Sequence, residues 1–226
     1  MIVVGSIGVL IVFLFVGWAV SSEMFQQRAW RHRVESGDVD IVGALIEEAL
    51  ATWRRARPPK GTPSQLWAGV QGAQLVAVTT DSATLSGSAE PEFRTEGAAR
   101  VQVSSALDEA IALAAKLIDM VMYDVPNLRL GSVRVDIYAT FGGTDGAPVQ
   151  KPILTTTADR LEADHLSWEA LTPAEVLGRF TTRYERNEAG QGVPIDLDPI
   201  EGSPPRPAEE AAADFAAEQR HSPGAG

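Results

Sequence analysis

The N-terminal segment constrains this chain more strongly than any other part of its sequence. Residues 2–20 (IVVGSIGVLIVFLFVGWAV) carry no charged side chain. As a helix rising about 1.5 Å per residue, this run would extend about 28 Å, close to the thickness of a bilayer's hydrocarbon core. We therefore expect residues 1–22 to form a single transmembrane anchor, in contact with the lipid bilayer through residues 2–20.

A cleaved signal peptide is the alternative for this segment, because Ala19-Val20-Ser21 loosely resembles a small-x-small cleavage site. No Lys or Arg precedes the apolar run, however, and the run is longer than an ordinary signal-peptide core. These two departures favour an uncleaved signal anchor.

Basic residues flank the expected anchor on one side only. The chain carries Arg28, Arg31 and Arg33 after the apolar run and no basic side chain before it. Basic flanks remain on the cytoplasmic side of a membrane. We therefore expect a single-pass protein of the cell (inner) membrane, with its N-terminus outside and its soluble domain in the cytoplasm.

Composition argues against several classes of function. The net charge is −11, from 30 acidic and 19 basic residues, whereas a nucleic-acid-binding protein needs a basic face. The chain has no cysteine, which excludes disulfides, thiolate nucleophiles and iron–sulfur clusters. Arginine outnumbers lysine by 16 to 3, and this bias, with abundant alanine and glycine, suggests a bacterial, GC-rich genome.

Residues 23–60 are expected to form a juxtamembrane helical region. Asp38 or Asp40 can cap a helix that runs to about Arg57, where Pro58 and Pro59 stop it. A second, short helix is expected over residues 64–71.

Residues 61–186 are predicted to form an α+β soluble domain. The sequence from Ser105 to Asp108 matches a capping box that opens a long helix ending near Tyr123. Apolar and polar residues alternate from Ser132 to Phe141, which is typical of a strand with one buried face. Its expected partner strand, residues 149–158, contains Pro152 and should therefore lie at a sheet edge or carry a bulge.

Shorter strands are expected at residues 75–79, 83–89 and 100–104, spaced closely enough for antiparallel hairpins. Short helices should cover residues 159–165 and 172–180. Together these elements predict a two-layer domain in which an antiparallel sheet packs against the long central helix.

Residues 187–226 form an acidic segment rich in proline and alanine, and we expect this tail to be disordered. Within it, residues 208–219 could form a transient helix. A partner-binding segment is the alternative interpretation of the tail.

The sequence contains no recognisable catalytic, cofactor or metal motif. The three histidines are far apart, and none has the spacing of a zinc-binding pair. Residues 142–146 are rich in glycine but link two expected strands, so they predict a hairpin loop and not a phosphate-binding loop. We therefore expect no catalytic residues, no cofactor and no metal.

One cluster of polar and aromatic residues is a candidate for partner binding. Part of it surrounds the turn after the central helix, and the rest projects from the expected solvent-facing side of the next strand. Such groups on an open sheet face can form a binding surface, although an ordinary solvated face is the alternative. The candidates are Tyr123, Asp124, Asn127, Arg129, Arg134, Asp136 and Tyr138.

These features favour a membrane-anchored, non-enzymatic accessory or scaffold protein whose soluble domain binds a protein partner, such as a larger integral membrane complex. A membrane-tethered ligand-sensing domain and a tethered enzyme with an unrecognised site are the alternatives.

The orientation of the expected anchor can be tested by protease protection in oriented vesicles. We expect the soluble domain to resist protease added to the outer face and to be digested from the cytoplasmic face, because the arginine flank retains it inside. Digestion of the domain from the outer face would overturn the cytoplasmic assignment.

Overall fold

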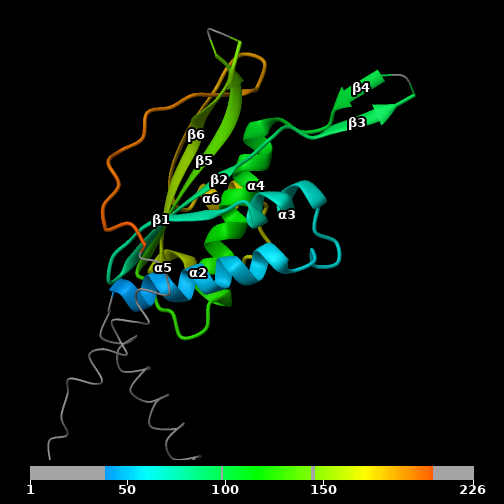
Figure 1. Ribbon diagram of the computed structural model, residues 1–226. Helices are drawn as coiled ribbons and strands as arrows, with labels where there is room; N and C mark the ends of the chain where they lie inside the picture. Colours follow the sequence, from blue (N-terminus) through cyan, green and yellow to red (C-terminus); the bar gives the residue numbers. More distant parts are fainter. Residues whose placement is uncertain (1–38, 98, 144–145, 206–226) are drawn as a thin grey trace, which may run out of the picture. The chain divides into compact units, whose positions relative to one another are not determined.

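The computed structural model describes residues 39–97, 99–143 and 146–205, which are coloured in Figure 1. The expected anchor at residues 2–20 and its flanking Arg28, Arg31 and Arg33 lie outside the described residues. Within the described residues, no helix has both the length and the apolar character needed to cross a membrane.

A six-stranded mixed sheet forms the centre of the domain. Its strand order is β1-β2-β5-β6-β7-β8. β2 and β5 are parallel, and every other pair of neighbours is antiparallel. The strands are β1 (Gln74–Val78), β2 (Ser82–Ser88), β5 (Ser132–Gly142), β6 (Pro148–Asp159), β7 (Thr181–Arg186) and β8 (Gly192–Val193).

The prediction of a wholly antiparallel sheet is wrong at the β2–β5 pair. The chain between these strands includes a long helix, and such a crossover allows the next strand to run parallel to the first. The hairpin expected around residues 142–146 is confirmed, because Gly142 pairs with Pro148 where β5 turns into β6.

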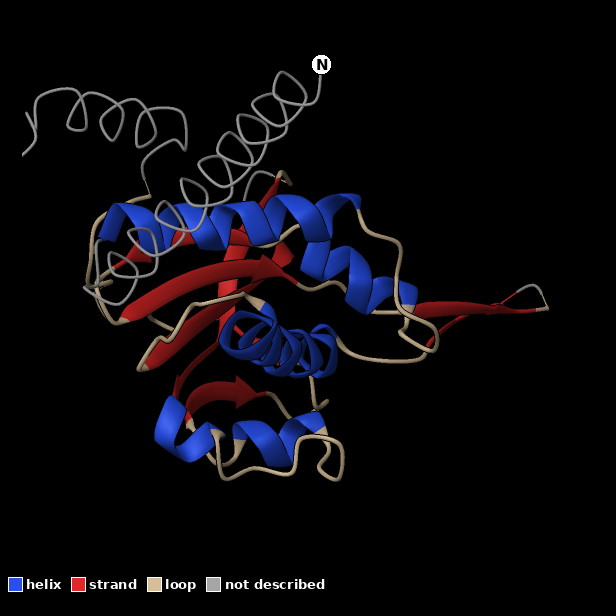
Figure 2. Ribbon diagram, turned by 90° about the horizontal axis from the view of Figure 1, so that it is seen from below, coloured by secondary structure: helices blue, strands red, loops and turns tan. Residues whose placement is uncertain are grey.

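The remaining layer consists of helices, which confirms a mixed α+β domain (Figure 2). α4 packs against β2, β5 and β6, while α3 and α6 pack against α4. The helical elements are α2 (Val39–Arg55), α3 (Ser64–Gln71), α4 (Ala106–Asp119), the π-helical turn η1 (Met120–Asp124), α5 (Arg160–Ala163) and α6 (Pro173–Leu177).

Local sequence accounts for the start of α4 and for its buried face. The predicted capping box is present: the Asp108 amide donates to the Ser105 hydroxyl over 3.1 Å, and the Ser105 amide donates to the Asp108 carboxylate over 3.2 Å. Apolar residues at helical spacing face inward and are almost completely buried, among them Leu107, Ala110, Ile111, Ala114, Leu117 and Ile118.

Two glycines allow neighbouring elements to approach α4 closely. A Cβ atom on Gly69 of α3 would lie 2.8 Å from Leu113 Cδ2, and one on Gly87 of β2 would lie 3.2 Å from the same atom. The Leu113 side chain therefore occupies space that larger residues at these two positions would need.

The pairing of β5 with β6 confirms the predicted irregularity near Pro152. Ile137 pairs with Leu154 but Tyr138 pairs with Pro152, so Ile153 is an extra residue that makes a bulge. On the inner face of β5, Val133, Val135 and Ile137 are fully buried.

Strands β3 (Phe93–Glu96) and β4 (Ala99–Gln102) form a separate two-stranded ribbon that projects from the domain (Figure 1). All eight of these residues are exposed. The third strand expected at residues 100–104 therefore pairs in this ribbon and not in the main sheet.

The chain after Asn187 remains ordered further than its composition suggests. β8 pairs with β7, and residues 194–205, which we call the strap, continue along the sheet. Ser203 exchanges two backbone hydrogen bonds with Val78 of β1, at 2.9 and 3.1 Å. The prediction of disorder from Asn187 onward is therefore wrong for residues 187–205, because backbone contacts with distant strands hold this segment in place. Residues 206–226, including the possible helix at 208–219, lie outside the described residues.

Candidate functional site

The predicted binding cluster is divided between two parts of the domain. Tyr123, Asp124, Asn127 and Arg129 lie in or just after η1, and all four are exposed. Asn127 adopts a left-handed conformation (φ 63°), which asparagine tolerates better than most residues. The other three candidates, Arg134, Asp136 and Tyr138, alternate with the buried residues of β5 and therefore face away from α4.

Asp136 is buried, contrary to the expectation of an open sheet face. Its residue is only 1% exposed. The Asp136 Oδ1 atom forms an ion pair with Arg134 Nε at 3.0 Å and accepts a hydrogen bond from the Thr155 hydroxyl at 2.6 Å. Burial, followed by the nearby Asp136 charge, raises the pKa of Tyr138. Asp136 and Thr155 are buried while Arg134 and Tyr138 are half-buried, so these groups form a largely covered polar layer.

The strap covers this polar layer. Arg134 donates to the backbone carbonyls of Asp198 and Pro199, over 3.0 and 3.2 Å. Arg183 of β7 donates to the carbonyl of Asp196 and forms an ion pair with Asp198 at 3.4 Å. The Arg134–Asp136 pair is therefore part of the contact that fixes the strap on the sheet.

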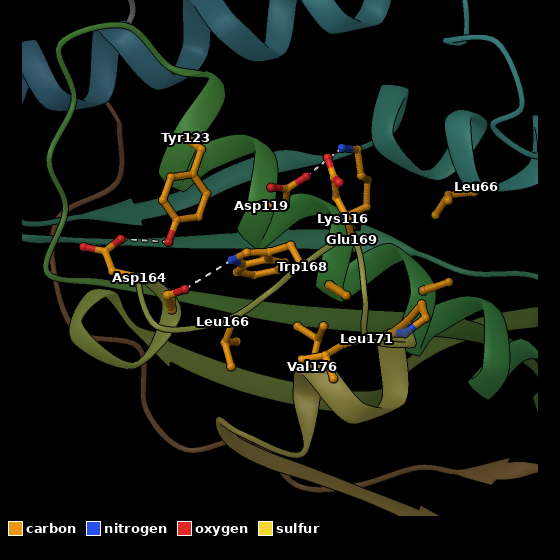
Figure 3. A pocket seen from close by; sticks show the side chains of 14 residues that line it. Leu66, Lys116, Asp119, Tyr123, Asp164, Leu166, Trp168, Glu169, Leu171 and Val176 are labelled. Atoms are coloured by element: carbon orange, nitrogen blue, oxygen red, sulfur yellow. Dashed lines mark hydrogen bonds and ion pairs between the residues drawn. The ribbon is translucent and has the colours of Figure 1, made fainter.

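On the helical side of the domain, an open groove of about 630 Å³ lies over α4. Figure 3 shows its side chains. Leu66 of α3 lies at one side, and Leu171 together with Val176 of α6 lies at the other. Ala112 and Ala115 of α4 contribute to its lining, so the groove is largely apolar.

The end of the groove near η1 carries polar and aromatic side chains. The Tyr123 hydroxyl donates to Asp164 Oδ1 over 2.8 Å, and the Tyr123 and Trp168 rings meet edge to face at 5.9 Å. Trp168 Nε1 donates to the carbonyl of Ala163 over 3.2 Å. These contacts fix two amphipathic aromatic rings beside the groove, the arrangement that binding surfaces favour.

Burial and the neighbouring carboxylate make Tyr123 a weaker acid. Burial contributes most, the hydrogen bond to Asp164 and its negative charge add to it, and together they raise the pKa of Tyr123 to about 12. Tyr123 is thus a neutral hydrogen-bond donor at physiological pH and not a base.

Arg160 holds this end of the groove together. Its guanidinium donates to the carbonyls of Leu130 and Met122, over 2.7 and 2.8 Å, and lies 5.5 Å from the centre of the Tyr123 ring. A cation at the end of a helix satisfies carbonyls that have no intrahelical partner. The π-helical turn that carries Tyr123 is thereby stabilised, and such turns are frequent at functional sites.

The rim of the groove is acidic. Lys116 pairs with Asp119 at 2.7 Å, and Arg160 pairs with Asp164 at 3.8 Å. The exposed carboxylate of Glu169, which also lines the groove, has no ion pair with a described residue. Beyond Tyr123, burial and the nearby Asp119 charge raise the pKa of Asp124. A ligand that carries positive charge would complement this rim.

Of the seven predicted binding residues, only Tyr123 lines the groove. Sequence reasoning missed Trp168, Asp164 and Leu171, which follow Tyr123 in the chain by about 40 residues. Helical spacing places four of the lining residues on one side of the helix: Ala112, Lys116, Asp119 and Tyr123. Nothing in the sequence indicates that this side of α4 stays uncovered.

Comparisons with protein-family models, with curated proteins and with solved structures find no match to this chain. In the part of the chain that the structure describes, no three His, Asp or Glu side chains are grouped as metal ligands.

Two arginines that both bind the strap provide a test of the buried ion pair. We expect Arg134→Ala to lower the free energy of unfolding by about 3–5 kcal/mol, because it leaves the buried Asp136 carboxylate without a counter-charge. Arg183→Ala removes an exposed ion pair and should lower the free energy of unfolding by less than about 1 kcal/mol. Urea unfolding of the full chain in detergent, followed by circular dichroism, measures both.

A double variant separates the lost charge from the lost volume. Replacing Arg134 and Asp136 together by leucine should recover most of the stability that Arg134→Ala removes, since no buried charge remains. If Arg134→Ala and Arg183→Ala lower the free energy of unfolding equally, the buried ion pair does not have the role described for it.

Proposed function

We propose that this chain is a membrane-anchored accessory or scaffold protein whose soluble domain binds a protein partner through the groove over α4. In this proposal residues 2–20 lie in the cell (inner) membrane with the N-terminus outside. The domain lies in the cytoplasm, and the partner is a larger integral membrane complex. The proposal assigns no catalytic residue, cofactor or metal.

The open apolar groove beside α4 is the observation that carries the proposal. Trp168 is partly exposed at the end near η1, the apolar Leu66, Leu171 and Val176 also line the groove, and charged groups lie at its rim. Protein-binding surfaces have this composition, with aromatic and apolar side chains surrounded by a polar border. Anchoring supports the same proposal, because it raises the effective concentration of the domain near membrane partners.

A ligand-sensing domain has less support from this geometry. Pockets for small molecules enclose most of the ligand's surface, whereas this groove is open to solvent. On the other side of the sheet, the strap binds Arg134, and Asp136 is buried.

Because the chain has no cysteine, a single introduced cysteine reports on one position. We expect Glu169→Cys at the groove to react at least about tenfold more slowly with maleimide in native membranes than in purified protein, because the partner covers it. The matched control, Glu188→Cys, lies on the exposed turn before β8 and should react at the same rate in both.

Two outcomes would contradict the proposal. Equal reactivity of the Glu169→Cys protein in membranes and after purification would show that nothing covers the groove. Equal slowing at both positions would show general shielding by the membrane and no specific partner.

A further inference from the structure

One side of α4 remains uncovered although the helix is otherwise buried. Its exposed and half-exposed residues follow helical spacing: Ala112, Lys116, Asp119 and Tyr123 lie on one line, with the small Ala115 beside them. A residue as small as alanine allows another helix to approach the backbone closely. This line is therefore shaped to contact a helix.

The walls of the groove are also spaced to hold a helix. Leu66 stands at one side and Leu171 at the other, with α4 between them (Figure 3). From Ala112 to Tyr123 the helix axis extends roughly 17 Å, which equals about three helical turns. α3 and α6 already pack on either side of α4, so a short helix in the groove would complete the helical layer.

Backbone pairing gives no comparable way to bind at this position. Strand addition requires the free edge of a sheet, but the residues that line the groove belong to helices and to the loop between α5 and α6. At β1, one edge of the main sheet, Val78 already pairs with Ser203 of the strap. A helix in the groove is the mode of recognition that these side chains permit.

The charges at the rim determine which helix fits. Three carboxylates line the groove, but Asp119 pairs with Lys116 at 2.7 Å and Asp164 pairs with Arg160 at 3.8 Å. No described residue forms an ion pair with Glu169. Basic residues beside an apolar stripe would complement Glu169, whereas acidic residues there would be repelled.

We propose that the groove binds a short amphipathic helix of the partner protein, with an apolar stripe on α4 and a Lys or Arg side chain against Glu169. This inference rests on the proposed function, because it specifies the partner of the same groove. A stripe of apolar residues at i, i+3, i+4 and i+7 is the pattern such a segment would carry.

Synthetic peptides test this inference with the full chain in nanodiscs of zwitterionic phosphatidylcholine. One peptide is an amphipathic helix of about 14 residues with lysines beside its leucine stripe. A second carries glutamate in place of each lysine, and a third has a central proline that prevents the helix. Binding is measured by the fluorescence anisotropy of labelled peptide, and empty nanodiscs provide the background.

We expect the lysine peptide to bind at least about tenfold more tightly than the glutamate peptide, and the proline peptide not to bind. The preference should decrease as salt is raised, because the rim charges are exposed. Glu169→Lys should weaken binding of the lysine peptide by about fivefold, whereas the matched surface change Glu188→Lys should leave it unchanged.

Ala112→Trp locates the binding site independently of charge. It fills the groove and should abolish binding of the lysine peptide, with an unchanged circular dichroism spectrum as the check on folding. If Glu169→Lys and a folded Ala112→Trp protein both bind normally, the peptide binds elsewhere and the inference is overturned.

The proposed function and this inference can fail separately. If no helical peptide binds, or if the glutamate peptide binds best, the basic-helix inference is overturned. Slow maleimide labelling of Glu169→Cys in native membranes would then still support a partner in the groove, but one of different chemistry.

Discussion

The domain depends on the burial of α4. Most of the helix surface is apolar, and Leu107, Leu117 and Ile118 are completely buried. Burying side chains of this size contributes roughly 1.5–3 kcal/mol each, so the sheet, α3 and α6 must all pack around one helix. These neighbours cover α4 on all but one side, and the groove is the part of its surface that they leave open.

The two sides of the sheet are occupied in different ways. On the side away from α4, the chain supplies its own cover: the strap satisfies Arg134, which in turn neutralises the buried Asp136. On the helical side, an apolar groove with Trp168 beside it has no cover from the described chain. This contrast is why the proposed binding site lies over α4 and not on the polar residues of β5.

Features with short-range causes were predictable from the sequence. The capping box at Ser105, the alternating strand from Ser132 and the bulge near Pro152 each follow from a few adjacent residues. The parallel β2–β5 pair and the separate ribbon were not predictable in this way, because strand pairing depends on how distant segments return to the sheet. The sequence-based prediction did not include strand β7, although Thr182 and Tyr184 alternate there with charged residues.

Long-range contacts also explain the errors in the tail and in the site. The proline-rich, acidic sequence of residues 194–205 is typical of disorder, but Arg134, 64 residues before Asp198, and Arg183 of β7 both bind it. The predicted binding cluster grouped residues that are neighbours in sequence. The groove instead combines Tyr123 with Asp164 and Trp168, which the chain brings back from a later segment.

Photo-crosslinking in the cell tests most directly whether the groove is where a partner binds. Benzoylphenylalanine replaces Leu171 in the groove or, in a second protein, the exposed Val101 of the β3–β4 ribbon. We predict one discrete crosslinked product from position 171 on illumination and none from position 101. A product from position 101 with none from position 171 would contradict the account and place the partner on the ribbon.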